Sequence, residues 1–166
     1  MSTENLKQTE AILKLKELAE DIKFALMATD LQAKPAHVIP MTTKEVDEDG
    51  NIWFLSDKNS THNQNILTEG FAHLFYSKGT SMEFLSVYGQ ASIVTEPAII
   101  EKLYNKADDV WFEGVNDPNI SAIKISPLQS HYWDTKNGII TTLFNLGLNI
   151  ITGEKRDLGA QGELHI

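Results

Sequence analysis

The chain contains no cysteine among its 166 residues. Disulfides, zinc thiolate sites, iron–sulfur clusters and cysteine nucleophiles are therefore excluded together. Long hydrophobic runs are also missing. The longest candidate, residues 138–152, is interrupted by threonine, asparagine and glycine before it reaches the roughly 18 apolar residues of a membrane span. The first residues lack the apolar core of a signal peptide. We expect a single cytoplasmic domain that covers residues 1–166.

Basic residues are scarce relative to acidic ones. Lysine and arginine number 14 against 23 aspartate and glutamate residues, so the formal charge is −9. A nucleic-acid or anionic membrane surface would be repelled unless a basic patch compensated. The nearest candidate, Lys14, Lys16 and Lys23, is interleaved with acidic residues on one expected helix. We therefore predict neither a nucleic-acid partner nor a membrane partner.

Several catalytic motifs are absent as well. No glycine-rich turn follows the first expected strand, which disfavours a dinucleotide-binding fold. No Gly-x-Ser-x-Gly elbow is present, and no two histidines lie one helical turn apart as metal ligands. If the chain is an enzyme, a cofactor must supply the chemistry.

The apolar periodicity that is present predicts an α+β barrel with peripheral helices. Helices are expected over residues 4–22, 60–69, 97–105 and 138–151. Strands are expected over residues 24–29, 36–43, 52–56, 71–78, 82–95, 120–126 and 130–135, with a polar tail over 153–166.

Three local signals refine this arrangement. Pro40 lacks a backbone donor, so its strand is expected either to be an edge there or to turn that N–H side to something other than a neighbouring strand. Gly89 lies inside a long expected strand and indicates a bend or bulge. The acidic run 47–51 predicts a hairpin turn in which Gly50 adopts positive φ. A calcium loop is the alternative, but the later bidentate glutamate is missing at the required spacing.

A candidate cofactor site follows the strand over residues 52–56. Ser60, Thr61 and His62 occupy the first turn of the next expected helix. Free backbone N–H groups and the positive dipole end make a helix start suited to a phosphate. By residue type, Ser60 is equally an ordinary N-cap and His62 an ordinary polar residue.

The order of these segments resembles a known family. A strand with Pro-Met is followed by an Asp-Glu-Asp-Gly turn, an Ile-Trp-Phe strand, a Ser-x-His helix start and a long strand ending Val-Tyr-Gly-Gln-Ala; Trp-Phe-Glu-Gly, Asp-Pro and Tyr-Trp-Asp come later. Over roughly residues 22–153 this is similar to the general stress protein 26 branch of the pyridoxamine 5′-phosphate oxidase-like proteins. The resemblance implies a Greek-key-like split β-barrel of about six antiparallel strands with peripheral helices.

The resemblance also implies a homodimer that binds FMN, or less readily FAD or another flavin, at the subunit interface. The strand residues implied to lie along the isoalloxazine are Ile39, Pro40, Met41, Leu55 and Ser56. The residues implied to surround the phosphate are Ser60, Thr61 and His62. Two tryptophans from the partner subunit are candidates to close the site, or else to anchor the dimer: Trp111 and Trp133. No metal site is implied.

Two positions depart from the family pattern. The family often has arginine where this chain has Ile39, and lysine where it has His62, so two permanent positive charges are lost. His37 lies on the same strand face as Ile39 by period-two alternation and is a candidate substitute. Because histidine titrates near 6.5, phosphate binding is expected to be weaker at neutral pH.

Two functions remain open from the sequence. The first is a flavin-binding general stress protein that acts as a low-specificity flavin oxidoreductase with NAD(P)H. The alternative is a non-catalytic dimeric module that holds flavin or another small ligand, or whose flavin site is weakened or lost. Oxidation of pyridoxamine phosphate itself is disfavoured, because no basic clamp for a substrate phosphate is found near the candidate site.

Overall fold

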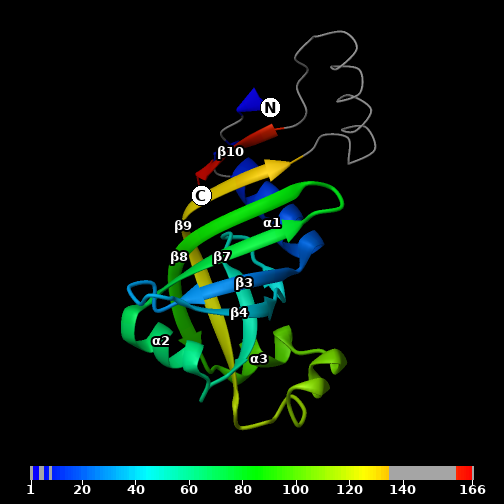
Figure 1. The fold of residues 1–166 in the computed structure, drawn as a ribbon. Coiled ribbons are helices and arrows are strands. Elements are labelled where there is room, and N and C mark those ends of the chain that lie inside the picture. Colours follow the sequence, from blue (N-terminus) through cyan, green and yellow to red (C-terminus); the bar gives the residue numbers. More distant parts are fainter. Residues whose placement is uncertain (1, 4–5, 8, 135–159, 166) are drawn as a thin grey trace.

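The computed structural model describes residues 2–3, 6–7, 9–134 and 160–165. They form a curled, mainly antiparallel sheet with helices at its periphery, which confirms the predicted α+β split barrel (Figure 1). The barrel strands are β3 (Phe24–Thr29), β4 (His37–Thr42), β6 (Ile52–Asp57), β7 (Phe71–Lys78), β8 (Glu83–Val94) and β9 (Ile120–Asp134).

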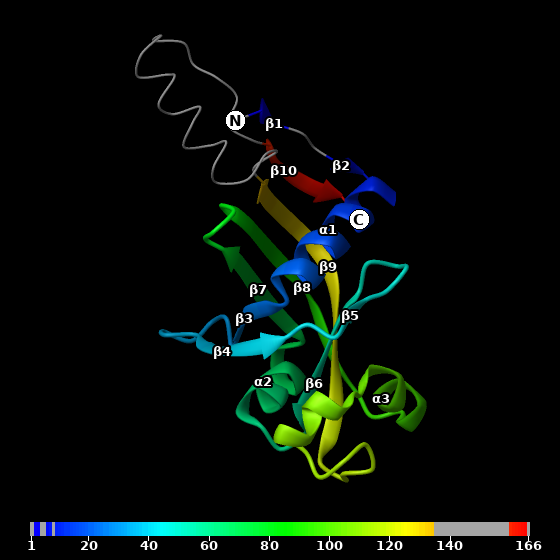
Figure 2. The ribbon, with the colours of Figure 1, turned by 90° about the vertical axis from the view of Figure 1, so that its right-hand side faces the viewer.

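The sheet is open between β4 and β6. Along the sheet the order is β9-β8-β7-β3-β4, while β6 pairs with the other edge of β9 and with the short β5 (Glu45–Val46). Among the described residues, β4 pairs only with β3, so Pro40 lies on an edge strand as predicted. The two facing edges of β4 and β6 make the split in the barrel (Figure 2).

Gly89 marks the predicted bulge in β8. The register between β8 and β9 shifts between Tyr88 and Gly89. A Cβ atom at Gly89 would lie 2.5 Å from the carbonyl oxygen of Ser126, so the close approach of β9 requires glycine here. Two separate strands were predicted over 120–126 and 130–135, and this was wrong. The register shift at Gly89, opposite Pro127, accommodates the proline, and β9 continues without a break from Ile120 to Asp134.

Three α-helices lie at the periphery of the sheet. Of these, α2 (Thr61–Glu69) begins after the N-cap Ser60 and ends at Gly70 with φ 71°, as predicted. The first, α1 (Thr9–Ile22), begins five residues later than predicted, because β2 (Leu6–Lys7) pairs with β10 instead. The third, α3 (Pro97–Leu103), ends before the predicted residue 105 and leads to the 3-10 helix η1 (Lys106–Val110), which Asn105 caps.

The chain ends return to the same part of the sheet. The strand β10 (Ala160–His165) pairs antiparallel with β9, and the short β1 (Ser2–Thr3) pairs parallel with it. A polar tail was predicted over residues 153–166, which was wrong for β10. The buried Leu164 is the single large apolar residue of this strand, so its sequence shows little apolar periodicity. The predicted helix over residues 138–151 lies outside the described residues.

Two apolar clusters lie on opposite faces of β6. Phe54 belongs to the main core, which α1 covers with Leu15 and Leu18, whereas Leu55 belongs to a smaller cluster beneath α3. In the part of the chain that the structure describes, no helix is long and apolar enough to cross a bilayer.

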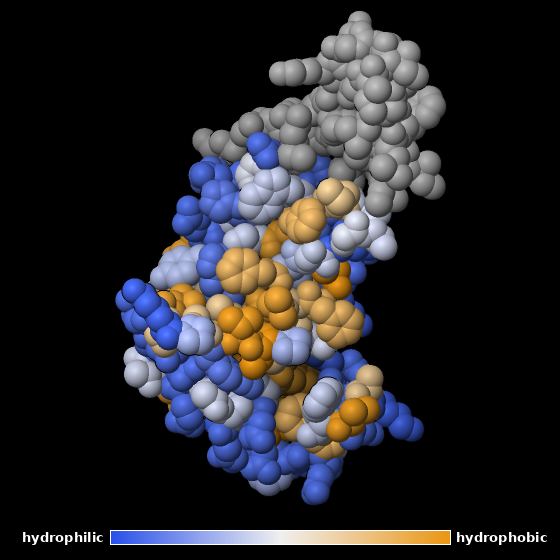
Figure 3. All heavy atoms as spheres, viewed as in Figure 1, coloured by the Kyte–Doolittle hydropathy of each residue, from blue (hydrophilic) through white to orange (hydrophobic). Residues whose placement is uncertain are grey.

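One sheet face remains exposed and apolar, and we call it the outer face. Cross-strand pairing aligns Leu26 with Phe75 on this face, and Phe75 with Ser86. Figure 3 shows apolar side chains gathered over this part of the sheet. Its large exposed members are Phe24, Leu26, Val38, Phe71, Phe75 and Trp133.

Candidate functional site

A cavity of about 300 Å³ lies in the split of the barrel. It is bounded by the edges of β4 and β6, by the start of α2 and by η1 with the two residues after it. Its lining comprises Ile39, Pro40, Met41, Thr42, Lys44, Leu55, Ser56, Asp57, His62, Asp108, Trp111 and Phe112. The structure therefore brings seven of the sequence-predicted site residues to one cavity: Ile39, Pro40, Met41, Leu55, Ser56, His62 and Trp111.

The start of α2 is fixed to the sheet by a buried polar network. The Ser56 hydroxyl donates to Asn63 Oδ1 at 2.8 Å and contacts Ser121 Oγ at 3.0 Å, and Asn63 Nδ2 donates to Ser121 Oγ at 2.8 Å. All three side chains are buried. The hydroxyl of Ser56 is thus used to hold α2 against β6 and β9, which places the helix start at one end of the cavity.

That end carries two histidines. His37, at the start of β4, stacks on His62 with ring centroids 6.4 Å apart and ring planes within 9°. His62 Nε2 lies 3.0 Å from Ser60 Oγ, which also caps the helix by accepting from the Asn63 N–H. Burial, and then the charge of His37, lower the pKa of His62, while Asp57 opposes this shift. Thr61 is exposed in the same turn.

The opposite end carries an ion pair that sequence reasoning missed. Lys44 Nζ donates to both carboxylate oxygens of Asp108, at 2.9 and 2.7 Å, and both side chains are largely buried. Asp108 also accepts from the Asn105 N–H and so caps η1. The pair therefore holds η1, with Trp111 and Phe112 behind it, over the cavity. The partners lie 64 positions apart, so no local pattern indicates the pairing.

The two predicted tryptophans lie in different places. Trp111 lines the cavity of its own chain although it is 80% exposed. Trp133 lies on β9 opposite Phe84, on the outer face, and does not line the cavity of its own chain. The expectation that either residue reaches the site of a partner subunit stays a prediction.

The acidic segment before β6 is a structural turn. Asp47 accepts hydrogen bonds from the backbone of Asp49 and Asn51 and from Trp53 Nε1, and Gly50 has φ 82°. The carboxylate oxygens that a calcium ion would need are occupied by these donors, which supports the hairpin interpretation. Within the described residues, no three histidine, aspartate or glutamate side chains are placed to hold a metal ion.

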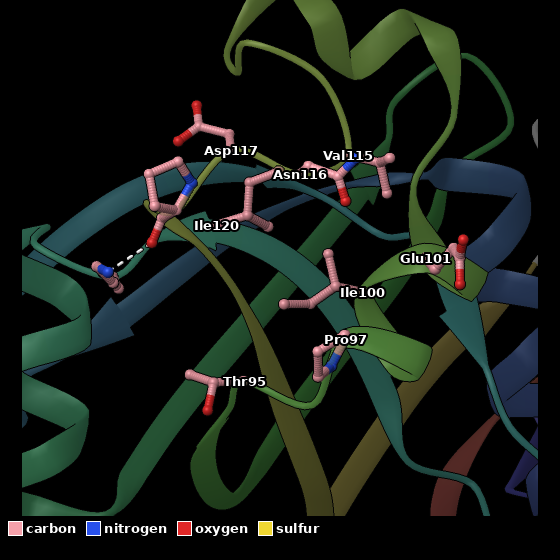
Figure 4. Close-up of a pocket in the computed structure, with 10 residues that line it drawn as sticks. Thr95, Pro97, Ile100, Glu101, Val115, Asn116, Asp117 and Ile120 are labelled. Atoms are coloured by element: carbon pink, nitrogen blue, oxygen red, sulfur yellow. Dashed lines mark hydrogen bonds between the residues drawn. The ribbon is translucent and has the colours of Figure 1, made fainter.

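A second cavity, of about 320 Å³, lies between α3 and the segment before β9 (Figure 4). None of the predicted site residues lines it. Two of its charged groups have internal partners: Lys58 Nζ donates to the Pro118 carbonyl, and the Asp117 carboxylate accepts from the Glu113 and Asn119 N–H groups. The cavity in the split, which seven predicted site residues line, is therefore the better candidate for the functional site.

The cavity in the split suits an elongated, flat ligand with one anionic end. Its middle is apolar, its His62 end offers imidazoles beside a helix start, and its other end holds a neutralised ion pair. Lys44 is the only lysine or arginine among the lining residues, and Asp108 pairs with it. These features favour a ligand whose anionic end lies near the histidines.

Comparisons with known proteins agree with this geometry. A curated relative, protein bli-3 of Neurospora crassa, is 24% identical over 144 residues, which cover 80% of this chain and 68% of that protein. The fold is similar to that of a general stress protein 26 candidate from a Jannaschia species, with a TM-score of 0.80 and 20% identity over 96% of this chain and all of the other.

A more distant structure shares the same fold. It is a pyridoxamine 5′-phosphate oxidase-related, FMN binding protein of Nostoc punctiforme, with a TM-score of 0.57 and 14% identity; 75% of this chain and 80% of the other are covered. The sequence profile of a family described as pyridoxamine 5′-phosphate oxidase like matches residues 10–157. Because this profile spans most of the sequence, the chain belongs to the pyridoxamine 5′-phosphate oxidase-like family.

Proposed function

We propose that this protein binds FMN in the cavity between β4 and β6 and uses it as a low-specificity oxidoreductase with NAD(P)H as reductant. The observation that carries the proposal is the apolar split closed at one end by a helix start and by His62, on which His37 stacks. Family membership and the relative described as FMN binding support it. A bound flavin supplies hydride or single-electron transfer, so the protein need only bind and orient it.

Each part of the lining has a role in this proposal. The flat ring would lie along the strand residues Ile39, Pro40, Met41 and Leu55. The phosphate would lie near Ser60, Thr61, His62 and His37, where the backbone N–H groups of α2 add a positive potential. Trp111 and Phe112 would limit the access of water to the ring.

The proposed assembly is a homodimer formed through the outer face. Monomeric proteins rarely expose contiguous apolar patches of this kind, and Leu26, Phe75 and Trp133 all lie on it. Pro40 lies opposite Leu26 on β4 and also lines the cavity. A second copy on this face would therefore reach the edge of the flavin site.

The alternative function is a non-catalytic flavin-binding or ligand-binding module. The neutralised Lys44 favours it, because no unpaired permanent cation lines the cavity within the described residues. Such a site would hold flavin weakly, and the dimer would act through its surfaces.

Absorbance and turnover separate these functions. The purified protein, incubated with FMN and desalted, is expected to retain oxidised-flavin absorbance in the visible range. A preparation that stays colourless would overturn flavin binding. If flavin is retained, NADPH or NADH oxidation under air by the loaded protein supports the oxidoreductase, whereas absence of turnover above that of free FMN supports the module.

A further inference from the structure

The phosphate end of the cavity is built from a histidine pair. His37 comes from β4 and His62 from α2, and their rings are parallel within 9° at 6.4 Å. Both residues are partly buried. An imidazolium charge on His37 disfavours one on His62 at this separation, and burial disfavours the charge on His62 further.

Few charges other than that of His37 act on His62. The Asp57 carboxylate on β6 is the one acidic group that favours protonation of His62, and Ser60 offers a neutral hydroxyl at 3.0 Å. Lys44 and Asp108, from the far end of the cavity and from η1, neutralise each other. The pKa of His62 is accordingly lowered by burial and by His37, so without ligand His62 is mostly neutral above pH 7.

We propose that the His37–His62 pair takes up protons when a phosphate monoester dianion binds, so that ligand binding is coupled to proton uptake from solvent. This inference rests on the proposed function, because it assigns the phosphate of the flavin to this end. A dianion beside the rings favours their charged form, and the two charges that repel each other in the free site then share a counterion. The site thereby acquires, on binding, the cations that the sequence does not supply permanently.

Calorimetry of FMN binding to the full chain tests this coupling. FMN is titrated at pH 8 in three buffers of different ionisation enthalpy. The slope of the observed binding enthalpy against the buffer ionisation enthalpy gives the number of protons taken up. We expect about one proton for FMN and none for riboflavin, which lacks the phosphate. Free FMN is already a dianion at this pH, because its second phosphate pKa is near 6.

Variants assign the protons to the pair. His37→Gln and His62→Gln are each expected to lower the slope by about half and to weaken FMN binding, while riboflavin binding is unchanged. His165→Gln, on the half-exposed C-terminal strand β10, is the matched control and should keep the wild-type slope. Thermal melts of all three variants check that the fold is retained.

The outcomes distinguish failure of proton coupling from failure of the proposed flavin binding on which it rests. If FMN binds with a slope of zero, or if the slope survives in both histidine variants, proton coupling by the pair is overturned while flavin binding stands. If neither FMN nor riboflavin binds, the proposed function itself falls and the inference falls with it.

Discussion

At the scale of single residues, His62 is the titratable group at the α2 end of the cavity. It stands in the first turn of α2, where a lysine would carry a permanent charge, and its pKa is lowered by burial and by His37. Its contribution therefore depends on pH, unlike that of the helix start, whose backbone N–H groups do not titrate.

Replacing His62 by lysine should tighten FMN binding by about three- to tenfold at pH 8, since a permanent cation replaces a mostly neutral imidazole. Wild-type affinity should strengthen from pH 8 to pH 6, and the variant should respond less. Flavin fluorescence titrations at pH 6, 7 and 8 measure both effects. A flat wild-type series across that window would remove His62 from the phosphate site.

Gly89 is required by packing and not by its φ angle. Gly89→Ala should lower the free energy of unfolding by about 1–3 kcal/mol, because its new Cβ would meet the Ser126 carbonyl oxygen at 2.5 Å and Ile125 Cγ2 at 2.9 Å. Gly79→Ala is the matched control, with no atom within 4 Å of the added Cβ, and should change stability by no more than about 0.5 kcal/mol. Urea denaturation measures both; equal effects would contradict the packing argument.

At the scale of elements, a largely buried ion pair attaches η1 to the barrel. The Lys44–Asp108 contact joins the segment between β4 and β5 to a helix of five residues, which is too short to be stable alone. Phe112, next to Trp111, adds an apolar attachment by packing against the smaller cluster.

Asp108→Asn should release η1, because an amide holds Lys44 and the Asn105 N–H less strongly than a carboxylate. We expect a loss of about 1–3 kcal/mol in unfolding free energy, measured by urea denaturation. Lys102→Ala, which removes the exposed pair with Glu45, should not change the unfolding free energy measurably. An Asp108→Asn stability identical to wild type would show that η1 is held otherwise.

At the scale of the whole molecule, the proposed homodimer would form through the outer face. Leu26→Glu, at the centre of the proposed dimer interface, should convert the dimer to a monomer, because it places a charge against an apolar partner surface. Leu13→Glu, an equally exposed position on α1, should leave the dimer intact. Light scattering after size-exclusion chromatography measures the molar mass of each variant and so its oligomeric state. A wild-type monomer at micromolar concentration would reject this interface.

Acid should destabilise the molecule through its partly buried histidines. The pKa of His62 and that of His73 are both lowered by burial in the folded state, so the unfolded chain binds protons more readily. The stability is present in full above about pH 7.5 and is lost as pH falls through the unfolded value near 6.5. Unfolding free energies at pH 8, 6.5 and 5.5 test this, and His73→Gln should reduce the slope.

The sequence predicted what local signals specify. Ser60 and Gly70 bracket α2 because a cap and a left-handed residue act on their own helix, and Pro40 and Gly89 mark an edge and a bulge wherever they occur in a strand. These positions sufficed to locate the strand edge and the helix start that border the cavity.

Long-range pairings could not be predicted in the same way. The Lys44–Asp108 ion pair and the Ser56–Asn63–Ser121 network join elements whose proximity depends on the finished barrel. The strand β10 is similar, since its pairing with β9 is not encoded in its own six residues. Properties of the site that depend on such contacts, including the neutralised cation, needed the structure.

The position of β9 has a consequence for the order of biosynthesis. Among the described residues, β6 has no strand partner other than the two-residue β5 until β9 exists, and β9 begins at Ile120. A nascent chain that has emerged only as far as α3 can pair β3, β4, β7 and β8, but it cannot hold β6 opposite β4. The cavity is therefore assembled only after β9 has been synthesised, and a ligand that stabilises it cannot act on earlier intermediates.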